Sequence, residues 1–492
     1  MTGDHETRTV GGLPTPGDGG SRLPAALTRA VWLLWVVSLG VSAVWLRRGG
    51  PQVSAGPVAV DGLTVLMWTV VAFFGGIVHS YSRRYMAGER DANGFFGRVF
   101  AFTLIVMVLV AADAFLLFWA AWLAMGLVMA GLIGHGDWPQ AQAAGALARR
   151  YFLASGALLA AGLVALWRHT GATTVSGVGG AVGSDPSTVV LAAAGTLLLA
   201  AMTQSALVPF HGWLLSSMTA PTPASALMHA GFVNAGGILL VRFAPVVTVD
   251  TRVMLAIVIV GAAGALTGKL LKSVRTDVKG ALGCSTVGQM GFMIMQAGLG
   301  FFAAAVTHFL LHGFYKAYQF LASGSRVAHE HPAKSDPGST GVAGAAVGVA
   351  TAVAGAGLFV VLTGKGSGNG LLLAGLVGLT VLHAARDVTA RPSLPGTVRY
   401  GAVPLVALPA VAVYGGVYRA VEGLLVGLPA VGTTATEPTA VHVLVAVAFL
   451  AAYLVVEIGV HRRSRRLYVT LLNAGRPPSW TTLTSTEEYD EY

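Results

Sequence analysis

Long apolar runs separated by short polar stretches set the pattern of this chain. The runs are about 20 residues long, the length an α-helix needs to cross a bilayer. Strands of a membrane β-barrel would be about 10 residues long and would alternate, so that fold class is excluded. A window of about 19 residues predicts about 14 transmembrane helices, at 24–46, 62–80, 95–113, 115–134, 148–167, 187–218, 223–243, 251–272, 282–300, 302–324, 341–363, 368–385, 399–418 and 438–460.

The sixth run, 187–218, is too long for one crossing and contains Gln204 and Pro209. Proline lacks the backbone N–H that a helix interior requires, and its ring clashes with the preceding turn. We therefore predict a discontinuous helix that breaks around Gln204–Pro209. Broken helices are tolerated at membrane depth only where they line a cavity or the protein interior.

Composition strengthens the membrane prediction. The chain has 492 residues, of which 54% are hydrophobic and only 11% charged, and its mean hydropathy is +0.70. Soluble domains carry roughly 25% charged residues, and a soluble fold of this size could not keep so much apolar surface from water. The single cysteine, Cys284, excludes a disulfide framework and a cysteine-rich metal or iron–sulfur site.

The basic residues predict the orientation. With 14 spans, 23 of the 31 Lys and Arg residues fall on the side that holds both termini, and 7 fall on the other side. Basic residues collect in cytoplasmic loops, so both termini are predicted to be cytoplasmic in a cell-membrane protein. The net charge of +10 thus reflects topology, and no nucleic-acid partner is expected. We divide the chain into a disordered cytoplasmic tail (1–22), a transmembrane domain (23–466) and a cytoplasmic C-terminal tail (467–492).

Three titratable residues share one face of a predicted membrane helix. His308, His312 and Lys316 are spaced at i, i+4 and i+8 in THFLLHGFYKAYQF, which places them in line along the helix. An ionisable group inside a membrane helix costs roughly 2.5–3.5 kcal/mol even on a mild scale, so it indicates function by default. The three residues are candidates for a proton path. The alternative is two hydrogen-bonded core histidines and a lysine that reaches the membrane surface.

Two further histidines lie near the predicted break. His211 follows it in VPFHGW, and His229 lies in PTPASALMHAGFVNAGG. A histidine beside a broken helix suits proton transfer, because its ordinary pKa lies near neutrality. The alternative for both is hydrogen-bonded core packing.

Acidic and basic residues at helix ends are weaker candidates for the same path. Asp113, in VAADAFLL, could instead cap a helix. Asp277 and Lys279, in RTDVKGALGCST, could instead form a solvated loop that serves topology. Arg419 and Glu422 are predicted to pair with each other.

The charged groups late in the chain support fewer conclusions about function. Glu457 is predicted to lie at the membrane interface. For His383, Arg386 and Asp387 a functional and a structural role both stay open.

The chain contains no recognisable motif of an enzyme active site. It lacks a phosphate-binding loop with a lysine, a cluster of metal-ligating residues and a Ser/His/Asp set. The two histidines of HFLLH have helical metal-ligand spacing but lack the intervening glutamate of the metalloprotease motif. We therefore expect no metal, no cofactor and no catalytic residue here.

Several stretches resemble one superfamily in order along the chain, over roughly residues 60–325. The stretch SALVPFHGWLLSSMTAPTPASALMHAGFVNAGG is similar to the signature of the proton-conducting antiporter-like membrane subunits of respiratory complex I and Mrp antiporters. TDVKGALGCSTVGQMGFM, THFLLHGFYKAYQFLASGS and YSRRYMAGERDANGFF resemble further motifs of these subunits. The resemblance implies an all-α fold with inverted repeats.

Within the superfamily, three stretches resemble the DabB branch, whose members are subunits of the DAB inorganic-carbon accumulation complex. They are SALMHAGFVNAGG, HGFYKAYQFLASGS and RRLYVTLLNAG. This resemblance implies a large partner on the cytoplasmic face, DabA, which is similar to a zinc β-carbonic anhydrase. The partner would hydrate CO2, and this chain would supply a flux of protons or of sodium ions. Zinc is accordingly expected in the partner.

The chain departs from the superfamily at two positions. Relatives carry a glutamate after tryptophan and a lysine at the break, where this chain has Leu123 after Trp122 and Gln204. The path would then have to use the histidines and Lys316. Two alternatives stay open: a subunit of an Mrp-type antiporter or of a respiratory or hydrogenase complex, and a non-conducting anchor for a partner.

Overall fold

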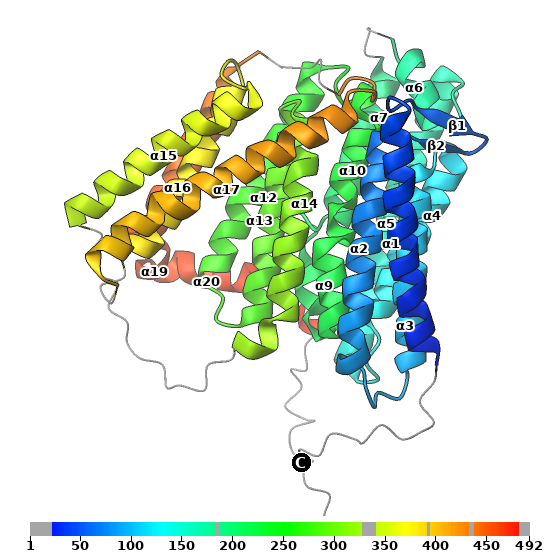
Figure 1. Cartoon of the computed structure of the whole chain (residues 1–492), viewed down its shortest axis with the longest axis horizontal. Coiled ribbons are helices and arrows are strands. Elements are labelled where there is room, and N and C mark those ends of the chain that lie inside the picture. Colours follow the sequence, from blue (N-terminus) through cyan, green and yellow to red (C-terminus); the bar gives the residue numbers. More distant parts are fainter. Residues whose placement is uncertain (1–21, 184–186, 327–340, 391–393, 432–436, 482–492) are drawn as a thin grey trace, which may run out of the picture.

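A computed structural model describes residues 22–183, 187–326, 341–390, 394–431 and 437–481 of the chain. These residues form a bundle of long helices with a single two-stranded hairpin (Figure 1). The predicted all-α membrane fold is confirmed. The predicted N-terminal tail, except Arg22, and residues 482–492 of the predicted C-terminal tail lie outside the described residues.

The first half of the chain forms the right-hand part of the bundle in Figure 1. Its elements are α1 (Leu23–Arg47), β1 (Val53–Ala55), β2 (Val58–Val60), α2 (Gly62–Tyr85), α3 (Ala92–Ala111), α4 (Phe115–Ile133), α5 (Pro139–Thr170), α6 (Val175–Ala181), α7 (Thr188–Gln204), α8 (Gly212–Ser216), η1 (Ser217–Thr219), α9 (Thr222–Ala230), η2 (Phe232–Asn234), α10 (Ala235–Arg242) and α11 (Ala244–Val247).

The second half forms the centre and left of the bundle, where α15, α16 and α17 lean away from the other helices. Its elements are α12 (Thr251–Ser273), α13 (Val278–Gly298), α14 (Phe302–Leu321), η3 (Ser323–Arg326), α15 (Gly341–Thr363), α16 (Gly370–Thr389), α17 (Gly396–Leu425), α18 (Ala440–Ile458), α19 (Val460–Arg463), α20 (Arg465–Ala474) and η4 (Ser479–Thr481).

Eleven helices of the described part are long and apolar enough to cross a membrane. The continuous stretch Thr222–Arg242 counts as one of them. The predicted number of 14 requires α7, α13 and α14 in addition, and it stays a prediction. α7 is only 17 residues long, and α14 carries His308, His312 and Lys316.

The connections between helices gather at two ends of the bundle. At one end, Val58 pairs with Ala112 and Ala114 with Thr174 in isolated bridges. At the other end, Lys279 Nζ donates to the Ala220 carbonyl at 3.3 Å. We call this second end the basic end, because its connections and helix termini hold Arg83, Arg84, Lys269, Lys272, Arg275 and Lys279.

The predicted break is present. α7 ends at Gln204, and residues 205–211 are not helical before α8 begins at Gly212. Ala206 has a left-handed backbone with φ of 54°, which costs a residue with a Cβ roughly 1–2 kcal/mol. Such strain collects at functional sites, where the surrounding packing holds it in place.

A second discontinuity was missed. The stretch 223–243 was expected to be one helix, but α9 ends at Ala230 and α10 begins at Ala235. Gly231 has φ of −122°, and the Asn234 side chain donates to the Ala230 carbonyl at 2.7 Å. A side-chain donor thus replaces the helical backbone bond at that carbonyl.

No corresponding break occurs in the described helices after residue 340. α17 is continuous through Pro404 and Pro409.

Residues 465–481 pack against the basic end. Leu471 is buried with Leu215, Leu271 and Val274, and Arg275 Nη1 donates to the Gly475 carbonyl at 3.2 Å. α20 lies across the lower end of the bundle in Figure 1. Residues 467–481 of the predicted C-terminal tail therefore pack over the break.

Candidate functional site

The side chain of Lys316 is wholly buried, with 0% of the residue exposed. It lies on α14 five residues before the helix ends. Its Nζ donates to the Leu282 carbonyl of α13 at 2.8 Å. The predicted alternative of a lysine that reaches the membrane surface is therefore wrong. Insertion of a buried amine is costly unless it is paired.

The same carbonyl connects Lys316 to His229. Thr286 Oγ1 donates to the Leu282 carbonyl at 3.0 Å and lies 2.9 Å from His229 Nδ1. A hydroxyl has one proton to donate, so His229 Nδ1 must carry the hydrogen that Thr286 accepts. The tautomer assigned from this network leaves the lone pair on His229 Nε2, which is buried and has no protein partner.

His308 and His312 continue the row along α14. Their rings are nearly parallel, with centroids 6.0 Å apart. Both ring nitrogens of His312 and Nε2 of His308 are buried without a protein partner. Lys316, His308 and His229 all lie close enough to His312 to interact with it electrostatically. The structure thus brings four predicted residues together, which we call the central cluster: His229, His308, His312 and Lys316.

His211 lies apart from this cluster, at the basic end. Its Nε2 is 3.0 Å from the Ala474 carbonyl. A carbonyl only accepts, so Nε2 carries the hydrogen, and the lone pair is on Nδ1, which is buried without a partner. The contact with the last residue of α20 could not be anticipated from the motif.

Asp277 and Lys279 are also at the basic end and make structural contacts. Asp277 caps α13 through the Gly280 amide and pairs with Arg275 at 2.6 Å. Gln204 is buried at the end of α7, and neither atom of its amide group has a protein partner.

Asp113 lies at the opposite end of the bundle. Its two carboxylate oxygens accept from the amide and the hydroxyl of Ser176, both at 2.8 Å. These bonds hold α6 against the start of α4, which matches the capping alternative. The predicted Arg419–Glu422 pair is present at 3.1 Å.

The sequence reading missed several polar contacts. Asp61 and Arg242 form a buried ion pair at the opposite end. His79 is fully buried against Phe96 and Phe100. Thr286 was not selected although it lies in a recognised motif, because a single threonine in an apolar helix is no distinctive signal.

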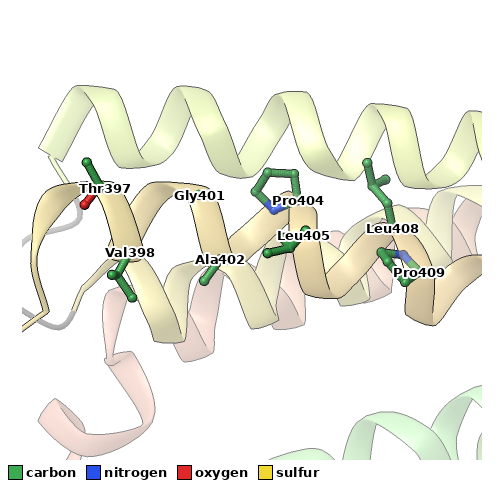
Figure 2. Close-up of a pocket in the computed structure, with 8 residues that line it drawn as sticks. All are labelled: Thr397, Val398, Gly401, Ala402, Pro404, Leu405, Leu408 and Pro409. Carbon is green, nitrogen blue, oxygen red and sulfur yellow. The ribbon is translucent and has the colours of Figure 1, made fainter.

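A hollow of about 760 Å³ lies elsewhere, along α17 (Figure 2). No titratable side chain lines it, and all its lining residues come from that one helix. It is therefore not a candidate for ion transfer. Its lining residues are Thr397, Val398, Gly401, Ala402, Pro404, Leu405, Leu408 and Pro409.

Comparisons with known proteins agree with this architecture. Residues 112–336 match the family described as NADH:quinone oxidoreductase/Mrp antiporter, TM. Residues 45–96 match the family described as NADH-Ubiquinone oxidoreductase (complex I), chain 5 N-terminus.

Two curated relatives are similar in sequence. The probable inorganic carbon transporter subunit DabB1 of Halothiobacillus neapolitanus is 38% identical over 283 residues, which are 56% of this chain and 50% of the relative. The NADH-quinone oxidoreductase subunit L of Mycobacterium tuberculosis is 36% identical over 293 residues, which are 58% of this chain and 46% of the relative. The chain thus spans about half the length of these curated relatives.

A solved structure shares the fold. In the membrane-bound sulfane sulfur reductase, an archaeal respiratory membrane complex, one chain is 16% identical with a TM-score of 0.59, and the match covers 94% of each chain. With the ordered matches to the two families, these likenesses mean that the chain belongs to the antiporter-like superfamily of membrane subunits found in NADH:quinone oxidoreductases and Mrp antiporters.

Proposed function

We propose that this chain is the membrane subunit of an inorganic-carbon accumulation complex. It conducts protons, or another cation, and thereby drives CO2 hydration by a zinc-containing partner on the cytoplasmic face. The observation that carries the proposal is the central cluster, in which a fully buried lysine, the buried His229 and His312 and the partly buried His308 lie on two neighbouring helices. The likeness to DabB1, a probable inorganic carbon transporter subunit, supports inorganic carbon as the substrate of the complex.

The bonding of the central cluster supports proton transfer. Lys316 and Thr286 both donate to the Leu282 carbonyl, and Thr286 accepts from His229, so these bonds fix the positions of Lys316 and His229 across α14, α13 and α9, while the carbonyl itself passes no proton. Water bound to the unpartnered nitrogens of His229, His308 and His312 would carry protons between the rings and Lys316, because buried polar atoms without a protein partner are those that ordered water satisfies. Leu123 and Gln204 carry no titratable group, so neither side chain can itself take up the proton.

Growth and flux test the proposal. In a host that depends on the complex for growth in air, Lys316→Met should abolish growth and proton flux, because methionine fills the space but cannot carry a proton. Lys365→Met is the control, since Lys365 pairs with Glu422 at 3.2 Å outside the central cluster. Wild-type growth of a well-assembled Lys316→Met strain would reject the proposal.

Zinc content tests the assignment of the chemistry to a partner. Fast CO2 hydration needs a metal-activated water, typically on Zn²⁺. We expect the purified complex to contain zinc and the separated chain to contain none. Stoichiometric zinc in the separated chain, lost in His308→Ala or His312→Ala, would place the chemistry in this subunit.

A second candidate function is a subunit of a respiratory NADH dehydrogenase or Mrp-type antiporter. The likeness to subunit L of Mycobacterium tuberculosis favours it. Co-purification from the native host separates the two functions. A large zinc protein as partner supports carbon accumulation, and a set of dehydrogenase or antiporter subunits supports the second candidate. A bare anchor role would leave the cost of burying Lys316 unexplained.

A further inference from the structure

A second line of titratable side chains lies at the basic end, outside the central cluster. His383 Nε2 of α16 is 2.8 Å from Lys269 Nζ of α12. His383 Nδ1 is 3.0 Å from Glu457 Oε1 of α18. Arg386, one turn after His383, also pairs with Glu457. Three helices that are far apart in the chain therefore meet through one imidazole.

The donors in this line can be assigned from its chemistry. A lysine ammonium only donates, so His383 Nε2 must accept and hold the lone pair. Nδ1 then carries the hydrogen and donates it to the carboxylate of Glu457. The imidazole is thus bonded at both ring nitrogens, which is the arrangement needed for transfer of a proton through the ring.

We propose that His383 is a proton relay at the basic end, which passes a proton between the amine of Lys269 and the carboxylate of Glu457. In the transfer an N–H bond breaks at Lys269 Nζ and one forms at His383 Nε2. The Nδ1–H bond of His383 breaks, and that proton adds to Glu457 Oε1. The imidazole ends neutral in its other tautomer, and the reverse sequence carries a proton the opposite way.

The position of the relay links it to the central cluster. Lys272 lies three residues after Lys269 on α12, so the two share one face of the helix. Lys272 is close enough to interact electrostatically with both Lys269 and Lys316. Lys272 therefore neighbours both the relay and the buried lysine, and we assign the relay as a port for protons at this end. The inference rests on the proposed function, since it requires a chain that conducts protons.

Exposure falls along the relay, because Lys269 is exposed and the two groups that follow it are largely covered. Only 9% of the Glu457 side chain and 30% of the His383 side chain are exposed. The Tyr453 ring of α18 also lies against His383, with ring centroids 6.2 Å apart, Arg386 pairs with Glu457, and the Asp387 carboxylate lies close enough to interact with Lys269. An ion pair alone would tie α16 to α18 through Arg386 and Glu457, without a histidine that also contacts α12.

The test uses the purified complex, with its partner subunits, in proteoliposomes loaded with a pH-sensitive dye. A potassium gradient with valinomycin drives the proton flux, which is measured from pH 5.5 to 8.5. His383→Gln keeps an acceptor for Lys269 and a donor for Glu457 but cannot pass a proton. We expect its flux to fall by about tenfold or more while the thermal unfolding temperature stays that of the wild type. The control is His169→Gln, an exposed histidine in the last turn of α5, which should conduct as the wild type does.

The outcomes are distinct. Wild-type flux and an unchanged pH profile in His383→Gln, alongside loss of flux in Lys316→Met, would overturn the relay and leave the proposed function standing. Absence of flux in the wild type would overturn both. If His383→Gln does not assemble, Glu457→Gln decides by the same criteria, because its amide oxygen still accepts from His383 but cannot take up a proton.

Discussion

At the scale of single residues, Thr286 connects His229 to the carbonyl that Lys316 also binds. It is the only hydrogen-bond partner of His229 among the described residues, and it shares the Leu282 carbonyl with Lys316. Removal of its hydroxyl would leave His229 Nδ1 buried without a partner. Loss of a partner for a buried polar group costs about 1–3 kcal/mol, and the fixed tautomer of His229 would be lost with it.

We expect Thr286→Val to lower the thermal stability of the purified protein and to reduce proton flux. The matched control is Thr307→Val on α14. Thr307 is equally buried, but its hydroxyl has no protein partner, so its replacement should be neutral or slightly stabilising. Melting curves and flux measured side by side check the pair. Equal behaviour of the two variants would mean that the Thr286 bond does not position His229.

At the scale of elements, the contact between α12 and α13 sets the geometry of the site. The two helices approach through glycines, and a Cβ added at Gly268 would lie 2.1 Å from the Gly288 nitrogen. A Cβ added at Gly291 would lie 2.3 Å from the Ala265 nitrogen. Small residues permit such close backbone contact in membrane helices. This contact holds α13, with Leu282 and Thr286, in place beside α14.

Gly268→Leu should therefore prevent correct folding, because the neighbouring atoms are backbone and cannot move aside like a side chain. Overpacking of a well-packed core costs about 1–3 kcal/mol, and we expect at least the upper value here. The control is Gly97→Leu on α3, where an added Cβ meets nothing within 4 Å. The yield of monodisperse protein after solubilisation measures both. Normal yield of Gly268→Leu would contradict the close packing of α12 on α13.

At the scale of the whole molecule, the two ends of the bundle should lie on opposite sides of the membrane. The basic end is predicted to face the cytoplasm, since basic residues collect there. The chain suits a labelling test, because its single cysteine, Cys284, is fully buried.

In intact cells, a membrane-impermeant maleimide should label Ser54→Cys, in the exposed strand β1. It should not label Glu89→Cys, in the exposed connection between α2 and α3, until the membrane is permeabilised. Unaltered protein provides the background signal. The reverse pattern would invert the orientation and would place the proposed zinc partner on the other side.

The sequence alone determined the features that depend on local chemistry. The length of the apolar runs predicts membrane helices, because the bilayer thickness sets the number of residues needed to cross it. Pro209 predicts the break, because it cannot donate a helical hydrogen bond. The spacing of His308, His312 and Lys316 places them on one face, because the helical repeat is 3.6 residues. Each of these inferences needs only residues close together in the chain.

Which of these residues lie together depends on how the helices pack in three dimensions. The tertiary structure joined His229 to Lys316 through Thr286, separated Asp113 and His211 from them, and covered the break with residues 465–481. It also assembled Lys269, His383 and Glu457, which the sequence left as separate charges near helix ends. The residues that these contacts join lie far apart in the chain. The shortest separation is 34 residues, between Leu282 and Lys316, and the longest is 263, between His211 and Ala474. Their positions follow from the packing of whole helices, which no local pattern encodes.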